Sequence, residues 1–223
     1  MSGGSLYISL TERDDIIAKK ILQEMARKLD LAIKLAVPQI KPHVGNVIED
    51  SMLENDVLNA IHGGNLMGAL GLTSSQGLNA AIEIASMIAN SVNVTRKKVT
   101  LKGTGLGGGL TIKVQPSDFS DVLGISEGVV EYFSKKYEGM VKLDWLNWLL
   151  TRGDDIIVGD YSFIERTGSG RSGLGAMAAG GLFRIPPEYS GTEADNFITR
   201  TLLSEAVTDK ILQVVEQHIS AKL

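Results

Sequence analysis

The spacing of apolar residues changes sharply near residue 92, and this change constrains the fold more than any other feature. Over residues 11–37 apolar side chains recur every three or four positions, which is typical of an amphipathic helix. Over residues 92–115 they alternate with polar ones, imperfectly at first and then cleanly, which is typical of β-strands. Helical and extended patterns in separate stretches predict an α+β protein.

Two helices are expected at the N-terminus. The first covers residues 11–37, with Thr11 as its N-cap. Pro38 and Pro42 lack a backbone N–H and restrict the residue before them, so we expect the first helix to end there. A second helix should run from Pro42 to about Ala60. The pair would form a helical hairpin or a bent double helix.

The middle of the chain is predicted to hold a loop, a helix and a β-hairpin. Residues 62–76 are punctuated by glycine and should form a loop with a short turn, and helical spacing resumes over 76–90. The alternating stretch then contains Gly103–Gly109, which would close a hairpin between two strands. For 116–140 the pattern fits either helix or strand, and both remain open.

Both tryptophans lie in a predicted short helix, 144–150, that is apolar on almost every side and therefore belongs in a core. Residues 155–165 should follow as a strand with Gly159 as a bulge. Residues 173–178 and 182–185 are two shorter strand candidates.

A long helix is expected at the C-terminus. Pro186 and Pro187 end the strands, because neither can donate to a sheet. The helix should then run from Thr192, its N-cap, to His218 or beyond, with Asp195 in a capping-box position. One apolar ridge follows its length, formed by Leu203, Val207, Ile211, Val215 and Ile219.

We expect a single α+β domain over 1–223. It would comprise a helical arm over 11–60, a helix-and-sheet core over 76–200 with a small, mostly antiparallel sheet, and a long C-terminal helix over 192–223. A chain of 223 residues is long enough to bury a sizeable core without a disulfide or metal staple.

The overall charge gives no bulk field for a nucleic-acid backbone. The chain has 22 basic and 26 acidic residues, a formal net charge of −4. Arg96, Lys97 and Lys98 form a compact basic patch, which we interpret as a solvated strand edge. Sequence-specific nucleic-acid binding is therefore not expected.

The sequence lacks features that several other classes of protein require. There is no cysteine, which removes disulfides, thiolate metal sites and cysteine nucleophiles. No apolar run is long enough to span a membrane, and the first residues do not have the pattern of a signal peptide. We expect a soluble protein that is neither secreted nor membrane-spanning.

Two stretches match the dinucleotide pattern G-x-G-x-x-G, at 103–108 and 168–173. The pattern binds a dinucleotide when a strand precedes it and a helix follows, because the helix N–H groups then meet the pyrophosphate. The first match is followed by a strand-like pattern and the second by glycines and alanines that disfavour a helix. We therefore predict no nucleotide and no other cofactor.

No nucleophile or metal site is evident either. Ser172 lies among glycines but does not complete G-x-S-x-G, and no histidine is placed to activate it. Aspartates 154, 155, 160, 118 and 121 match no calcium-loop spacing, so helix-end and strand-edge solvation is the favoured interpretation. We predict no catalytic residues and no metal. A Glu–Asp pair for glycoside cleavage stays open as an alternative, because the two residues of such a pair meet in space and not in sequence.

Three stretches carry distinctive motifs, and a fourth a fainter one. They are WLNWLLTRGDDIIVGDYSF (145–163), GRSGLGAM (170–177), FRIPPEYSGTEADNFITR (183–200) and, more weakly, LNAIHGGNLMGALGL (58–72). Together they resemble neck, head–tail joining or tail-completion proteins of tailed bacteriophages. The Pro-Pro-Glu-aromatic-Ser-Gly-Thr turn leading into Asn-Phe-Ile-Thr-Arg is the most specific part.

The resemblance implies a structural protein of the virion without enzymatic activity, assembled in the host bacterial cytoplasm. It implies a homo-oligomeric ring that contacts other portal, neck and tail proteins, with no membrane partner and at most passive contact with DNA in the channel. Adaptor, stopper, tail-terminator and baseplate roles all remain open. From the residues alone, an enzyme that binds an anionic ligand through a glycine loop is the alternative.

The expected partner-facing surfaces are the loop over 168–175, together with Arg166 and Arg171, and the turn over 186–192. Ordinary surface ion pairing is an equally good interpretation of the arginines, and a rigid local turn is the favoured one for the prolines. The candidate interface residues are Arg166, Gly168, Gly170, Arg171, Ser172, Glu188 and Tyr189.

Overall fold

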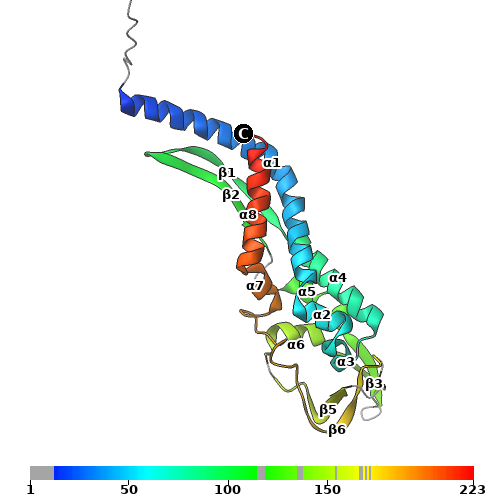
Figure 1. Cartoon of the computed structure of the whole chain (residues 1–223). Coiled ribbons are helices and arrows are strands. Elements are labelled where there is room, and N and C mark those ends of the chain that lie inside the picture. Colours follow the sequence, from blue (N-terminus) through cyan, green and yellow to red (C-terminus); the bar gives the residue numbers. More distant parts are fainter. Residues whose placement is uncertain are drawn as a thin grey trace, which may run out of the picture. The chain divides into compact units, whose positions relative to one another are not determined.

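The computed structural model describes residues 13–114, 119–134, 138–153, 155–165, 168, 170 and 172–223. It confirms a mixed α+β fold, 55% helical, with a long N-terminal helix, small two-stranded antiparallel sheets and a C-terminal helix (Figure 1). The elements are α1 (Asp14–Leu53), α2 (Asp56–Gly63), α3 (Asn65–Ala69), α4 (Ser74–Asn90), β1 (Asn93–Lys102), β2 (Gly105–Lys113), α5 (Ser120–Leu123), η1 (Ser126–Gly128), β3 (Val130–Ser134), β4 (Gly139–Leu143), α6 (Trp145–Thr151), β5 (Val158–Glu165), β6 (Gly175–Phe183), α7 (Phe197–Leu202) and α8 (Glu205–Ser220).

The chain separates into two compact units. The small unit contains Met1–Ile40, Val94–Ile112 and Val215–Leu223, and the large unit contains Lys41–Asn93 and Lys113–Val214. The β1–β2 sheet belongs to the small unit, and the β3–β4 and β5–β6 sheets belong to the large unit. The expectation of one domain over 1–223 stays a prediction.

The first helix does not stop at its prolines. α1 continues through Pro38 and Pro42 to Leu53, so the predicted break and the predicted second helix from Pro42 to Ala60 are wrong. Each proline removes one main-chain donor, but burying an apolar side chain gains roughly 1.5–3 kcal/mol, and a full row is buried here. The fully buried residues of this row are Ala36, Ile40, Val44, Ile48 and Met52. Thr11, the predicted N-cap, lies outside the described residues.

The predicted loop over 62–76 is largely helical, which corrects the sequence interpretation. The Oδ1 atom of Asn55 accepts a hydrogen bond of 2.8 Å from the Val57 N–H and begins α2. Thr73 and Gln76 form a capping box that begins α4, so the predicted helix over 76–90 is confirmed and starts slightly earlier. Gly64 and Gly68 are close-packing positions here, whereas Gly71 takes a positive φ of 69° in the turn before α4.

The hairpin of the small unit is confirmed, but its glycines are not all in the turn. Gly105 to Gly109 belong to β2, which leaves the turn to Gly103 and Thr104. Asp30 on α1 holds the hairpin, because its Oδ1 atom accepts hydrogen bonds from the Val99 N–H (2.9 Å) and from Arg96 (3.1 Å). The Val99 N–H, followed by the charges of Arg96 and Lys98, lowers the pKa of Asp30.

An apolar cluster lies beneath the same hairpin. Ala26, Ile33 and Val99 are its buried centre, and Leu29, Val37, Leu106, Leu110 and Ile219 pack around them. The small unit therefore has a core of its own, made from three separate stretches of the chain.

The stretch left open by sequence, 116–140, is mixed. Within its described residues, α5 and η1 come first and are followed by β3, which pairs antiparallel with β4. Trp145 at the start of α6 is fully buried, and its indole N–H donates a 2.8 Å hydrogen bond to the Glu127 carbonyl oxygen. The prediction of a core helix at 144–150 is confirmed.

β5 and β6 form one antiparallel hairpin. The two short strands predicted at 173–178 and 182–185 are a single strand, which is a correction. The register shifts between Gly159 and Tyr161, as the bulge prediction expected, and Asp160 takes a positive φ of 65° there. The strand stays continuous because Gly180 and Gly181 adopt positive φ values opposite this bulge.

The predicted C-terminal helix is two helices. α7 begins at its N-cap Asn196 rather than at Thr192, and Ser204 separates it from α8, where the Ser204 hydroxyl accepts a hydrogen bond from the Val207 N–H. Leu203 lies at this break and is 80% exposed, so it is outside the predicted ridge, of which Val207 is buried and Ile211, Val215 and Ile219 are half-buried. Among the described residues, no helix is long and apolar enough to cross a membrane.

Two glycines with different surroundings test how closely the helices of the large unit pack. A Cβ atom on Gly77 of α4 would lie 2.2 Å from the Ile61 carbonyl oxygen, whereas one on Gly45 of α1 would lie 3.5 Å from the Ala89 carbonyl oxygen. We expect Gly77→Ala to destabilise the protein by about 2 kcal/mol or more, since the backbones must separate.

The matched variant Gly45→Ala should stabilise the protein by about 0.5–1 kcal/mol, because alanine favours the helix and its methyl group fits. Urea unfolding followed by circular dichroism measures both. Equal effects of the two substitutions would contradict the close approach of α2 and α4.

Candidate functional site

Most of the polar groups in the FRIPPEYSGTEADNFITR motif hold the motif together. The N–H groups of Tyr189 and Ser190 donate to the Pro186 carbonyl oxygen at 2.9 and 3.1 Å, which closes the turn after the prolines. A Cβ atom on Gly191 would lie 2.6 Å from the Asn196 Cβ atom, so only glycine fits there. The rigid-turn interpretation of this motif is therefore supported.

Asn196 is the centre of the second half of the motif. It is fully buried, and its Oδ1 atom accepts hydrogen bonds from the N–H groups of Ile198 (3.0 Å) and Thr199 (3.1 Å). Its Nδ2 atom donates to the carbonyl oxygens of Thr192 (2.9 Å) and Glu193 (3.4 Å). A buried amide in which both ends are bonded fixes the turn against the start of α7.

An ion pair continues this arrangement on the surface. Arg200 Nε donates to the Asp195 carboxylate at 2.6 Å. This hydrogen bond lowers the pKa of Asp195 and raises the pKa of Arg200. The last residues of the motif are thus also bonded within the motif.

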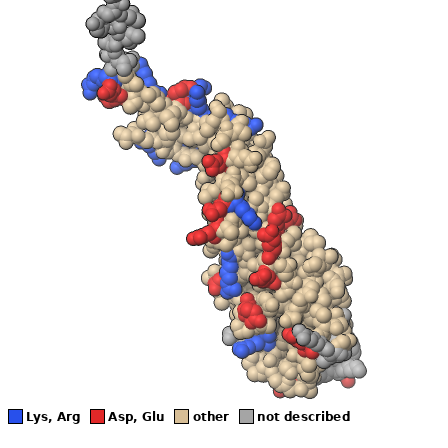
Figure 2. Space-filling view, viewed as in Figure 1, with Lys and Arg blue, Asp and Glu red and all other residues tan. Residues whose placement is uncertain are grey.

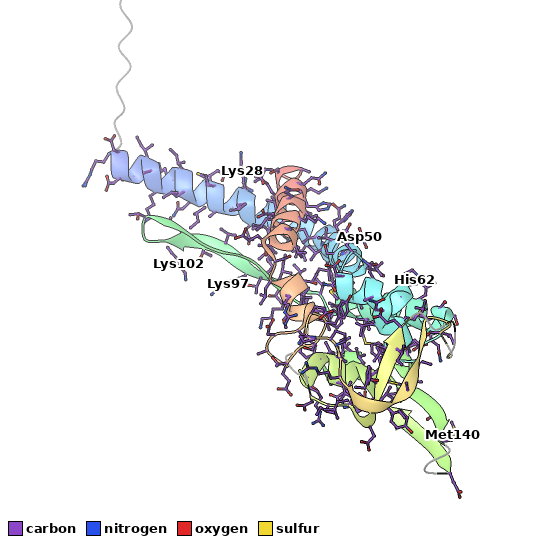
Figure 3. All side chains as sticks on the ribbon, turned by 60° about the horizontal axis from the view of Figure 1, so that its bottom comes forward. Lys28, Asp50, His62, Lys97, Lys102 and Met140 are labelled. Carbon is purple, nitrogen blue, oxygen red and sulfur yellow. The ribbon has the colours of Figure 1, made fainter. Side chains whose placement is uncertain are left out.

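Glu188 and Tyr189 of the same motif face outward. Glu188 is exposed and Tyr189 is half-buried, and both line an open groove of about 610 Å³ together with the end of α2 and the start of α3. The other lining residues are Asp56, Asn59, Ala60, Gly63, Gly64 and Asn65. None of the described residues that line this groove is basic, and Asp56 and Glu188 make it acidic. His62 precedes the lining residue Gly63 on α2 (Figure 3).

α3 connects this groove to the glycine loop. Asn65 lines the groove, and a Cβ atom on Gly68, one turn later, would lie 2.9 Å from the Phe163 ring and 3.0 Å from the Leu174 Cβ atom. α3 therefore packs directly on the β5–β6 hairpin. The glycine-punctuated stretch after residue 58, the glycine loop and the Pro-Pro turn come together around α3.

The glycine loop connects two strands. It lies between β5 and β6, and the first G-x-G-x-x-G match lies in the turn and second strand of the β1–β2 hairpin. Neither match leads into a helix, as the sequence interpretation expected. Gly168 and Gly170 have positive φ values of 64° and 90°, and a Cβ atom on Gly170 would lie 2.0 Å from the Gly175 carbonyl oxygen.

The remaining predicted residues have mixed outcomes. The Ser172 hydroxyl accepts a hydrogen bond of 3.2 Å from the Leu174 N–H, so it stabilises the loop. Arg166 and Arg171, and also Asp118 and Asp154, lie outside the described residues. His43, His62 and His218 lie on α1, α2 and α8. Over the described part of the chain, no group of three or more Asp, Glu, His or Cys side chains is arranged so that it could hold a metal ion.

One pair of carboxyl groups was not visible in the sequence. Glu83 on α4 and Glu127 on η1 share a hydrogen bond, which raises the pKa of Glu83 and lowers the pKa of Glu127. The Ser126 hydroxyl also donates to Glu127 and contributes to its lowered pKa. The two residues are far apart in sequence, so only folding brings them together.

Comparisons with protein-family models, with curated proteins and with solved structures find no match.

The buried amide of Asn196 gives a direct test of the motif. We expect Asn196→Ala to destabilise the protein by about 2–3 kcal/mol, because a helix cap is lost and buried carbonyl groups lose their donor. Asn196→Asp keeps the cap acceptor but places a second acceptor oxygen where Nδ2 donates to the Thr192 and Glu193 carbonyl oxygens, so it should also destabilise the protein. Urea denaturation midpoints measure both, and an unchanged midpoint for Asn196→Ala would contradict the role assigned to this residue.

The carboxyl pair predicts a pH-dependent stability. The pKa of Glu83 is raised in the folded state. Its contribution to the free energy of unfolding is therefore complete below 4.5, the pKa of the unfolded state, and is lost as pH rises through the folded-state pKa. The pKa of Glu127 is lowered in the folded state. Its contribution to the free energy of unfolding is therefore present above 4.5 and is lost as pH falls through the folded-state pKa. Raising the pH from 4.5 to 7.5 should therefore remove the shared proton and destabilise this contact.

Glu83→Gln retains a donor at every pH, so its Tm at pH 7.5 should exceed that of the unmodified protein by up to about 4 °C, and the two should agree near pH 4.5. Glu49→Gln on α1 is the control for loss of one negative charge at a half-buried position. A Tm difference that is the same at both pH values would show that no proton is shared.

Proposed function

We propose that this protein is a structural subunit of a tailed-bacteriophage virion, assembled as a homo-oligomeric ring at the head-to-tail connection and without enzymatic activity. The observation that supports the proposal is the convergence of the resembling stretches around α3. The groove joins residues of 58–72 with Glu188 and Tyr189, and α3 contacts Phe163 of 145–163 and Leu174 of 170–177. Stretches that are separate in sequence thus meet around one short helix.

In the 183–200 motif some residues hold the backbone and others are exposed, which also supports an interaction surface. Asn196, Gly191 and the Asp195–Arg200 pair hold the backbone, and the described structure gives the Glu188 side chain no hydrogen bond or ion pair. A rigid turn that presents an acidic and an aromatic side chain beside an open acidic groove suits a basic side chain of a partner protein. Other portal, neck and tail proteins are the proposed partners.

The proposal also includes a position for the ring within the particle. We favour a neck position, as adaptor, stopper or tail-completion protein, over a tail terminator or a baseplate protein. Assembly in the host cytoplasm precedes incorporation into the particle. The protein makes no membrane contact in this proposal and touches DNA only where DNA passes through the ring.

Electron microscopy and mass spectrometry of purified particles test this proposal. The protein should be found in the particles, at the junction between head and tail, in a fixed number of copies. Its absence from particles, or its presence only at the distal end of the tail, would contradict the neck assignment.

A second experiment tests the groove. Glu188→Lys should greatly reduce incorporation into particles while leaving Tm within about 2 °C, because Glu188 is exposed and without a described partner. Glu193→Lys is the matched control, since Glu193 is an exposed glutamate in the same motif outside the groove. Equal incorporation of the two variants would show that the groove is not the contact surface.

A further inference from the structure

Charge is divided unequally between the two units. The small unit holds 11 basic and six acidic residues, a net charge of +5, whereas the large unit holds 11 basic and 20 acidic residues, a net charge of −9. In Figure 2 both signs of charge are visible around the first turns of α1 and over the large unit, so the division is one of total charge. The modest charge of −4 for the whole chain conceals this division.

The positive charge is most concentrated on the β1–β2 hairpin. Residues 93–113 contain five basic residues and no acidic one. Arg96 is paired with Asp30, but Lys97, Lys98 and Lys102 are exposed, and no described carboxylate forms an ion pair with any of them. Figure 3 shows Lys97 and Lys102 along this hairpin. The hairpin thus presents three lysines whose charges are not balanced within the described structure.

A complementary groove lies in the large unit. It has a volume of about 420 Å³ and is lined by Val47, Asp50, Leu53, Glu54 and Lys210. Glu54 forms a 3.5 Å ion pair with Lys210, whereas Asp50 is exposed and forms no ion pair with a described residue. The last turn of α1 lies here and has no basic residue, so the negative end of the helix dipole adds to the carboxylates.

We propose that the basic hairpin of one copy of this protein docks in the acidic α1–α8 groove of a second copy. The inference rests on the proposed function and names the surfaces through which neighbouring subunits would meet. A contact between two different surfaces of identical chains is heterologous, and such contacts close into a ring or extend as an open chain. Val47 and Leu53 supply apolar area beside the charges.

A second copy is a better partner for the hairpin than a nucleic acid. A phosphate backbone is attracted by the small unit but repelled by the large unit, with its charge of −9 from 11 basic and 20 acidic residues. A second copy is attracted through both units, because the positive small unit of one copy attracts the negative large unit of the other. The Debye length falls from about 8 Å at 0.15 M salt to about 3 Å at 1 M, so salt should weaken the contact.

Paired charge reversals test the contact. The hairpin variant carries Lys97→Glu, Lys98→Glu and Lys102→Glu, and the groove variant carries Asp50→Lys and Glu54→Lys. Light scattering at low salt should show the unmodified full-length protein well above its monomer mass of 23.9 kDa. Each variant alone should associate at least about tenfold more weakly. An equimolar mixture of the two should regain assembly, because a reversed hairpin then meets a reversed groove.

The control variant carries Lys19→Glu, Lys34→Glu and Lys222→Glu, which makes the same change of charge in the small unit away from the hairpin. It should assemble like the unmodified protein, and circular dichroism checks that every variant is folded. Assembly that survives either reversal, or a mixture that stays dissociated, would overturn the proposed contact.

Two further outcomes separate this contact from its alternatives. If a 30-base-pair DNA duplex binds the unmodified protein but not the hairpin variant, while assembly persists, the hairpin is a nucleic-acid surface and the proposed contact is wrong. If the reversed variants still assemble and still enter particles, this contact fails and the proposed virion role stands. A protein that is monomeric at all salt concentrations and absent from particles would overturn both.

Discussion

Both units of this protein depend on one apolar row along α1. In the small unit, Ala26 and Ile33 of this helix meet Val99 of the hairpin. In the large unit, Val44, Ile48 and Met52 are fully buried, and Gly45 comes close to the Ala89 carbonyl oxygen of α4. The gain from burying a full row explains why two prolines do not end the helix. Each proline removes one hydrogen bond, and every turn of buried side chains favours continuation.

Side chains that bond to the backbone decide how the other elements are attached. Asp30 holds the β1–β2 hairpin through the Val99 N–H, and Asn196 holds the Pro-Pro turn against the start of α7. Such contacts are specific in a way that apolar burial is not, because a donor or acceptor left unbonded in the interior is costly. The most distinctive motif of the chain is therefore largely a structural device, and Glu188 and Tyr189 are the part of it that faces outward.

The proposed function and the proposed contact use different surfaces of the molecule. The groove beside α3 offers an acidic site for a different virion protein, whereas the β1–β2 hairpin and the α1–α8 groove offer a site for a second copy. A ring subunit needs both kinds of surface: one to join its neighbours and one to meet the next component. Each of these surfaces includes an exposed charged side chain, such as Glu188, Lys97 or Asp50, that has no ion pair with a described residue.

The sequence by itself determined the α+β class, the helix over 76–90, the β1–β2 hairpin, the core position of Trp145 and the bulge near Gly159, because periodicity and turn chemistry are local properties. Only the tertiary structure decided that α1 passes through Pro38 and Pro42, that β6 is one strand, and that Asn196 rather than Thr192 begins the last helices. These outcomes depend on burial and on contacts with residues distant in the chain. The helix and strand propensities of a local stretch carry no information about such contacts. The same holds for the Glu83–Glu127 pair, for the groove beside α3 and for the separation of charge into two units, since each requires residues from separate stretches to meet.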